Sequence, residues 1–281
     1  MRRAALRAAG VLLTLAVLLA GFLAVAGLLL RSSRTTSDVY RQPFSRIALD
    51  LDNADVSVEP GPEGQIRVVR ELHWSVVEPK IEEHWESGVL RVRVRCALDV
   101  GQPCRVSYRL GVPPGTPLLV KIVGGDASVR DTTGPVGVDS GAGDVHLTRP
   151  AGDVSVMSRA GEVRVMAGLS RKATVDAHSG DVLLDFAAPP ASVDVRLISG
   201  NLAVQVPTGS SYAVDARTVA GAEDVSVADD TASGNAIHAR LTAGDLTVRY
   251  GSPGWTGGPP MPPAPSVPPV PSTPPVPPVP R

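Results

Sequence analysis

The sequence predicts an all-β protein: a β-solenoid of short strand repeats with an N-terminal β cap, preceded by one transmembrane helix and followed by a disordered Pro-rich tail. Three observations predict this architecture. A glycine, an acidic or amide residue and an alternating run of Val or Leu recur together through the second half of the chain. Within each repeat, apolar and polar residues alternate with a period of two, which is typical of half-buried strands. The longest apolar run and about half of the 27 prolines lie at the two ends.

Residues 1–34 are predicted to anchor the chain in a membrane. The segment 8–30 contains no charged residue, and a helix of that length is about 35 Å long, enough to cross a hydrocarbon core of about 30 Å. The very short N-terminal flank, which carries three arginines, favours export of everything after the helix. The alternative is a cleaved signal peptide that is processed at Ala24-Val25-Ala26. We expect the uncleaved single-pass anchor, followed by a linker over residues 35–44.

Residues 45–122 are predicted to form a β-rich cap. Pro/Gly turns separate four expected strands, Ile47–Val58, Ile66–Val77, Val89–Cys96 and Val106–Val112. The two cysteines of the chain, Cys96 and Cys104, flank a short connection between two of these strands, so a disulfide across a hairpin is the expected arrangement in an exported domain. The alternative is a pair of buried thiols, and a zinc site is disfavoured because no matched histidine pair accompanies the cysteines.

Residues 123–250 are predicted to form the solenoid itself. Its repeats begin at turns whose glycine supplies a positive φ and whose acidic or amide side chain bonds the local backbone. A single coil cannot bury its apolar face, so stability is expected to come from the stacking of neighbouring coils. The predicted turn residues are Gly125, Asp126, Gly143, Asp144, Gly152, Asp153, Gly161, Glu162, Gly180, Asp181, Gly200, Asn201, Gly244 and Asp245.

The run Val106–Gly115, followed by Leu118-Leu119-Val120-Lys121 and serial Gly-Asp-Val turns, resembles a bacterial extracytoplasmic β-strand-repeat family of adhesin-like proteins whose biochemical function is unknown. The resemblance covers roughly residues 45–250. It implies a membrane- or lipid-anchored β-solenoid outside the cytoplasm, without an established active site. The expected location is therefore the bacterial cell membrane, with the body on the extracytoplasmic side.

The last segment, residues 251–281, is predicted to be a disordered tail. It repeats a Pro-Pro-Val-Pro pattern, which favours polyproline II and cannot enter a sheet or a helix. The tail is either a solvated extension or a ligand for an aromatic-lined groove of a partner.

The charges exclude some partners. All 28 acidic residues lie between Asp38 and Asp245, whereas six of the 27 basic residues lie outside that stretch, so the body carries about seven net negative charges. Such a body is repelled by phosphate backbones and anionic headgroups, which disfavours nucleic acid and peripheral lipid binding. The membrane is expected as a partner only through the N-terminal helix.

No cofactor or metal is expected. The acidic turn residues could align into ladders that bind divalent cations, but turn chemistry explains them without a metal, and the calcium-binding nonapeptide is not reproduced.

The sequence also lacks the motifs of common enzymes, namely G-x-S-x-G, a P-loop and a dinucleotide fingerprint. His178, Ser179 and Asp181 are close in the sequence, but neighbouring strand residues point to opposite faces, and the segment matches the structural turn. We therefore predict no enzyme but an adhesin-like interaction protein or envelope scaffold with an envelope or protein partner. Two alternatives are a carbohydrate-active β-helix enzyme and a self-assembling scaffold resembling bactofilins.

Overall fold

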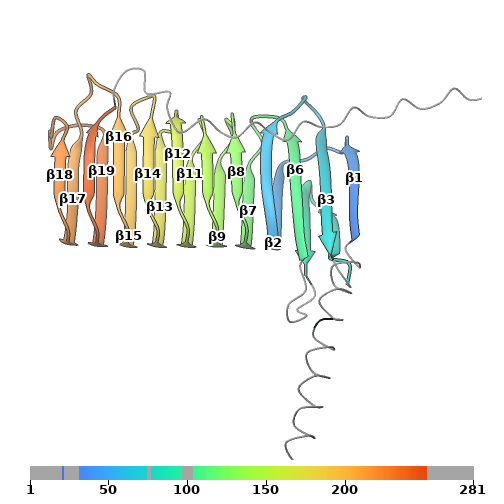
Figure 1. Ribbon diagram of the computed structural model, residues 1–281. Coiled ribbons are helices and arrows are strands. Elements are labelled where there is room, and N and C mark those ends of the chain that lie inside the picture. Colours follow the sequence, from blue (N-terminus) through green and yellow to red (C-terminus); the bar gives the residue numbers. More distant parts are fainter. Residues whose placement is uncertain (1–20, 22–31, 75–76, 97–103, 252–281) are drawn as a thin grey trace, which may run out of the picture. The chain divides into compact units, whose positions relative to one another are not determined.

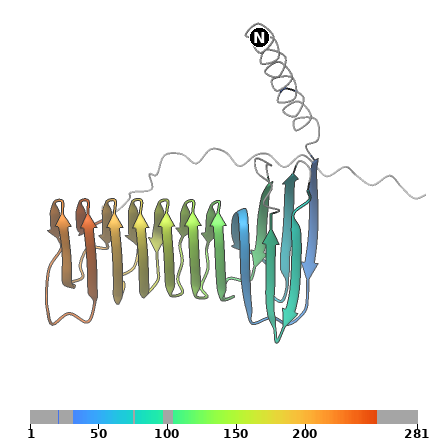
Figure 2. The same cartoon turned by 90° about the horizontal axis from the view of Figure 1, so that it is seen from below.

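The computed structural model of the protein describes residue 21 and residues 32–74, 77–96 and 104–251. Its strands form two sheets, called sheet A and sheet B, on either side of one apolar core (Figure 1). In most coils a strand in sheet B is followed by a corner and a strand in sheet A, and the next coil lies beside it in parallel. Figure 2, turned by 90°, shows the same succession of coils. The predicted all-β solenoid is thus confirmed.

The spatial order of the strands follows from their pairing. Sheet B contains, from one end to the other, β4 (Lys80–Glu86), β5 (Val89–Arg95), the first part of β2 (Arg46–Pro60), β7 (Leu118–Gly124), β9 (Val136–Ala142), β11 (Val154–Ala160), β13 (Lys172–Ser179), β15 (Ser192–Ser199), β19 (Ala236–Ala243) and β17 (Ala213–Ala220). Sheet A contains β1 (Ser32–Tyr40), β3 (Ile66–Trp74), β6 (Cys104–Val112), the second part of β2, β8 (Ala127–Arg130), β10 (Val145–Thr148), β12 (Val163–Gly168), β14 (Val182–Phe186), β16 (Leu202–Val206), β20 (Leu246–Tyr250) and β18 (Glu223–Ser226).

The period-two pattern sets which side chains enter the core. In β11, Val154, Val156 and Ser158 are buried, while Ser155 and Met157 face outward. Parallel pairing in register then places like residues over one another, as in the row formed by Val145, Val163 and Val182. Branched aliphatic side chains fill this thin core well, and their burial is the main stabilising contribution.

At both ends of the stack, the coils do not follow the order of the sequence. β19 lies between β15 and β17, and β20 lies between β16 and β18. The coil formed by β17 and β18 is therefore the outermost one, although β20 is the last described strand in the sequence. Similarly, β2 lies between the coil of β5 and β6 and the coil of β7 and β8.

Part of the predicted domain division is wrong. Residues 35–40 of the expected linker belong to β1, which pairs antiparallel with β3 along its whole length. The sequence Ser-Ser-Arg-Thr-Thr has no apolar alternation because this edge strand is largely exposed and is held mainly through its backbone. Within the predicted cap, β2 and β7 are in fact parallel members of the stack. The expected strand Ile66–Val77 ends at Trp74.

The predicted anchor and tail lie almost entirely outside the described residues, which include only Gly21 of segment 8–30 and only Gly251 of the tail. Among the helical residues that the structure describes, none belongs to a helix long and apolar enough to cross a membrane.

Candidate functional site

Most of the predicted turn glycines lie in one column, at the corner that leads from sheet B to sheet A, called the main corner. Their φ angles lie between 110° and 132°, and a Cβ atom at any of them would collide with a carbonyl of the neighbouring coil. At Gly161, for example, a Cβ atom would stand 2.2 Å from the carbonyl oxygen of Gly143. Only glycine fits such a corner. The column contains Gly125, Gly143, Gly161, Gly180, Gly200 and Gly244, and it continues to Gly221 in the outermost coil.

The acidic residues beside these glycines link successive coils. The Asp126 Oδ1 atom accepts the N–H of Asp144 at 2.8 Å, and Asp144 Oδ1 accepts the N–H of Glu162 at 2.8 Å. Further along, Asp181 Oδ1 accepts the N–H of Asn201 at 2.8 Å. These carboxylates satisfy backbone donors that the corner would otherwise leave unpaired. We call these contacts the corner ladder; the carboxylate of Glu162 instead pairs with Arg164 of its own coil.

The corner ladder continues across the out-of-order coils and then stops. Asn201 Oδ1 accepts the N–H of Asp245 at 3.2 Å, and Asp245 Oδ1 accepts the N–H of Ala222 at 2.9 Å. In the outermost coil, Ala222 occupies the ladder position and provides no side-chain acceptor. The ladder explains the acidic residues structurally, and no group of three or more His, Cys, Asp or Glu suited to hold a metal occurs among the described residues.

One predicted turn lies elsewhere. Gly152 and Asp153 precede β11 at the second corner, which leads from sheet A back to sheet B. A Cβ atom on Gly152 would stand 2.2 Å from the carbonyl oxygen of Gly134, so glycine is required here by close approach and not by a positive φ. The sequence motif is the same at both corners, and therefore the single series predicted from the sequence divides into two.

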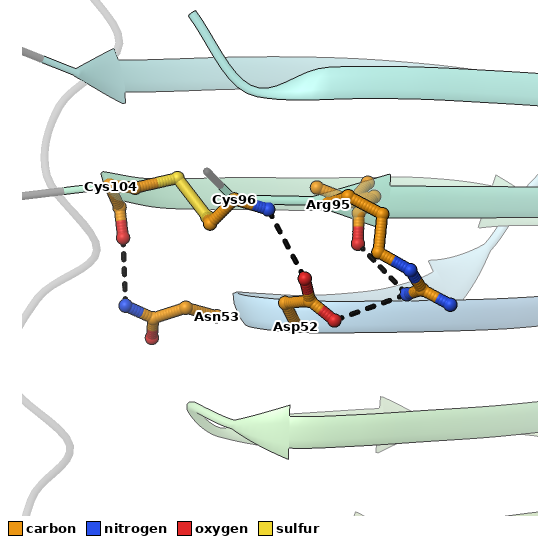
Figure 3. The surroundings of a disulfide bond; sticks show 6 residues. Asp52, Asn53, Arg95, Cys96 and Cys104 are labelled. Carbon is orange, nitrogen blue, oxygen red and sulfur yellow. Dashed lines mark hydrogen bonds and ion pairs between the residues drawn. A yellow bond between two sulfur atoms is a disulfide. The ribbon is translucent and has the colours of Figure 1, made fainter. Parts of the chain in front are cut away.

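The two ends of the corner between β5 and β6 are joined by the disulfide Cys96–Cys104, whose Cα atoms are 6.0 Å apart. The neighbouring coil holds both ends of this corner (Figure 3). Asp52 Oδ2 accepts the N–H of Cys96 at 3.2 Å, and Asn53 Nδ2 donates to the carbonyl oxygen of Cys104 at 2.7 Å. The disulfide thus lies at the same corner as the Gly-Asp turns of other coils and is bonded to the neighbouring coil, as they are.

Arg95 extends this arrangement into an ion-pair network. Its Nη2 atom lies 2.8 Å from Asp50 Oδ2, and its Nη1 atom lies 3.1 Å from Asp52 Oδ1. The hydrogen bond from Arg95, assisted by the charges of Arg93 and Lys121, holds the pKa of Asp50 below its ordinary value.

The outer face of sheet B, which is the face directed away from the core, carries a row of charges in register. From β4 to β13 the signs alternate, with one methionine in the row, and cross-strand neighbours of opposite sign stabilise a sheet. At the far end, three arginines stand side by side on β15, β19 and β17. The row comprises Glu82, Arg93, Asp50, Lys121, Asp139, Met157, Asp176, Arg196, Arg240 and Arg217.

Large aliphatic side chains are exposed on the same face. They are Leu119, Val123, Met157, Ile198 and Val219, with exposed fractions between 49% and 84%. Beside Leu119 lies an open hollow of about 420 Å³ over Gly137 and Ser155, with Arg46 and Lys172 among its lining residues. This combination of apolar and charged groups suits contact with another macromolecule better than chemistry on a small substrate.

The core closes at the β1 end with a cluster of polar and aromatic side chains. Arg70 Nη1 lies 3.0 Å from Glu83 Oε1, and Arg70 also pairs with Asp38, while the Tyr40 hydroxyl donates to Glu83. The Arg70 and Glu83 side chains are only 12% and 16% exposed. Burial, with the hydrogen bond to Glu83, raises the pKa of Tyr40 to about 12. A buried ion pair of this kind makes the end cap intolerant of losing either partner.

Comparison with known proteins gives one matching family model and several solved structures of low sequence identity and low TM-score. The model of the family described as Toastrack DUF4097 matches residues 127–249. A candidate adhesin from Bacteroides fragilis is 15% identical, with 78% of this chain and 98% of that chain covered and a TM-score of 0.41. A candidate cell adhesion protein from Clostridium sporogenes is 9% identical, with 78% and 100% covered and a TM-score of 0.31.

A candidate lipid-binding protein from Parabacteroides distasonis is 9% identical, with 79% and 97% of the two chains covered and a TM-score of 0.35. No curated protein sequence matches the chain. The resemblance to a bacterial β-strand-repeat family is confirmed over residues 127–249, where the chain is similar to the Toastrack DUF4097 family.

Proposed function

We propose that this protein is a non-enzymatic, membrane-anchored interaction protein of the bacterial envelope, with its solenoid on the extracytoplasmic side. The observation that carries the proposal is the outer face of sheet B, where five exposed aliphatic side chains lie on strands β7, β11, β15 and β17 among registered charges. Exposed aliphatic groups interspersed with charge are typical of surfaces that bind other proteins. The apolar segment 8–30 would hold the body at the membrane, and the partner would be an envelope component or protein.

Two matched variants test the role of this face. L119S/M157S removes one Leu and one Met from the outer face of sheet B, and L183S/M166S removes the same residue types from the outer face of sheet A. Cells producing the full chain would be measured for retention on a surface coated with their own isolated envelope fragments. We expect several-fold lower retention for the sheet B variant and unchanged retention for the sheet A variant. Equal retention for the two variants would contradict the proposal.

Location is tested separately, by adding proteinase K to intact cells. We expect residues 32–251 to be degraded without lysis. Protection of this region until the cells are broken would place the body in the cytosol, where the proposed envelope partner is not accessible.

A further inference from the structure

The open hollow beside Leu119, which we call the Gly137 hollow, crosses the outer face of sheet B. It has a volume of about 420 Å³ and is lined by residues of β2, β7, β9, β11 and β13. These strands stand side by side in Figure 1, in the order that their pairing gives. Neighbouring strands are about 4.8 Å apart, so the hollow extends about 19 Å from β2 to β13. Such a length suits an extended chain segment better than a compact small molecule.

Gly137 forms the floor of this hollow, although the fold does not require a glycine there. It lies inside β9, and its φ is not positive. A Cβ atom on Gly137 would come closest to Leu119 Cδ1, at 3.1 Å, which is the end of an exposed side chain that can turn aside. A glycine inside a strand weakens it and often marks a place where a ligand or another chain approaches closely. Its neighbour on β11 is the small Ser155, so both strands are open to such an approach.

Two cations stand at opposite ends of the Gly137 hollow. Arg46 begins β2 and Lys172 begins β13. Each comes one residue before the same registered row of buried side chains, so the two lie at the same level of sheet B. Both are exposed, and neither has an ion-pair partner among the residues that the structure describes. Asp153 lies between them, just before β11. On a body with net negative charge, this hollow thus presents positive charge at its two ends.

We propose that the Gly137 hollow binds an extended peptide segment of the envelope partner, with an acidic side chain at each end of the bound stretch and apolar side chains between them. The two carboxylates would pair with Arg46 and Lys172. At about 3.3 Å per residue, acids about six residues apart span the hollow. Between them, apolar side chains would pack on Leu119 and on the backbone of Gly137.

A peptide fits the charges of the hollow better than a polyanionic glycan does. Asp153 would repel a chain that carries a negative charge on every unit, but not a peptide that is charged only near its ends. The main chain of a peptide also offers N–H donors to this carboxylate. The inference rests on the proposed function, because it specifies the chemistry of the partner for the same face of sheet B.

Fluorescence anisotropy of a labelled heptapeptide, Glu-Ser-Leu-Ser-Leu-Ser-Glu, tests the site on the purified full chain in detergent micelles. In an extended conformation the glutamates and leucines of this probe share one face. We expect saturable binding. The same peptide with glutamine at both ends should have a Kd that is higher by about fivefold or more, because it lacks the charges that pair with the two cations.

Exchanging charges tests which residues hold the ends of the peptide. R46E/K172E should bind the glutamate peptide about tenfold more weakly, and it should bind the same peptide with lysine at both ends more tightly than the natural chain does. The control is R159E. Arg159 is exposed and lies at the other end of β11, near the main corner, so this variant should leave the Kd unchanged.

Gly137→Val tests the floor directly, because it fills the hollow without removing a charge or a hydrogen bond. We expect a Kd for the glutamate peptide that is higher by about tenfold or more. The fold should tolerate the change, since valine is favourable in strands. Ala203→Val, on the outer face of sheet A, is the matched control and should bind like the natural chain. Melting temperatures measured in parallel show whether each variant remains folded.

Three results would overturn the inference: a glutamate peptide that does not bind at millimolar concentration, binding that is unchanged in Gly137→Val and R46E/K172E, or an oligogalacturonate that binds more tightly than the peptide. Envelope retention separates this inference from the proposed function. Retention that is lost in L119S/M157S but kept in Gly137→Val would exclude the peptide site and leave the outer face of sheet B as the contact surface.

Discussion

At the main corner of each coil, two adjacent residues have different roles. The glycine permits a backbone conformation that residues with a Cβ atom rarely adopt and allows the neighbouring carbonyl to approach closely. At most of these corners, the acidic or amide residue accepts the N–H of the next coil. The sequence predicted both residue types and their turn. It could not show that Asp126, Asp144 and Asp181 bond the following coil, because these contacts join residues 18 to 20 positions apart.

Replacing Gly161 by Ala tests the first role. The φ of Gly161 is 121°, and a Cβ atom would stand 2.2 Å from a carbonyl oxygen, so we expect a loss of at least about 2 kcal/mol in the free energy of unfolding. Gly234→Ala is the control, because a Cβ atom there meets nothing within 4 Å. Chemical denaturation measures both variants, and equal stability would show that the corner can relax.

Replacing Asp144 by Ala or by Asn tests the second role. The Ala variant leaves the N–H of Glu162 without its 2.8 Å acceptor, at a cost of about 1 kcal/mol. The Asn variant keeps an acceptor oxygen, as Asn201 does for Asp245, and should retain most of the stability. Urea denaturation at pH 7 distinguishes the two variants. If Ala and Asn are equivalent, the ladder contact does not stabilise the fold.

At the scale of the elements, strands with alternating Val and Leu could be predicted, whereas the edge strands β1 and β4 could not. The polar sequences of β1 and β4 give no periodic signal, since they cover an end of the stack and contact the core with only a few side chains. The position of β19 between β15 and β17 was equally inaccessible, because its repeat has the same form as the repeats beside it. Within the candidate site, the turn residues and the cysteines could be predicted from the sequence, but the charge row across sheet B could not.

The Asp50–Arg95 pair between β2 and β5 predicts a pH dependence. Because the folded-state pKa of Asp50 lies below its ordinary 3.8, its contribution to stability is present above that pH and is lost as the pH falls through the folded value. Asp50→Asn should therefore be less stable than the natural chain by about 0.5–1 kcal/mol at pH 7, and the difference should shrink below pH 3.8.

Urea denaturation from pH 2 to pH 7 measures this difference. Asp139→Asn, which changes another acid of the same row, is the control and should show a smaller difference at pH 7. A difference for Asp50→Asn that stays constant as the pH falls would contradict the assigned ion pair.

At the scale of the whole molecule, the stack consists of nearly equivalent coils, each held mainly by its two neighbours. Its stability should therefore be close to a sum of coil and interface contributions. Two features that restrain local opening, the disulfide at the corner between β5 and β6 and the Arg70–Glu83 cluster, both lie toward the β1 end. The β17 end has neither, so local opening is expected to begin there.

Deleting one coil tests this modular architecture. Removal of residues 143–160 joins Ala142 to Gly161, which is one ladder step of 18 residues, so every later strand keeps its sheet. We expect a folded protein with a cooperative transition and a melting temperature lowered by several degrees.

The control removes only residues 152–160. This half-coil deletion sends each following strand to the opposite sheet, so we expect aggregation or loss of the cooperative transition. Circular dichroism and calorimetry measure both proteins. Equal behaviour of the two deletions would contradict a fixed coil length.

The inverted order of the last two coils affects how the chain reaches its native state as it emerges from N- to C-terminus. β17 is synthesised before β19. Ser192 of β15 and Ala213 of β17 are both registered with Ala236 of β19, so β17 has the alignment it would need to pair directly with β15 before β19 is present. If β17 pairs with β15 first, it must dissociate before β19 can take its native position between them. The final step of folding is thus the replacement of β17 by β19 beside β15. We expect this step to give a slow phase in refolding kinetics that disappears when residues 207–235 are removed.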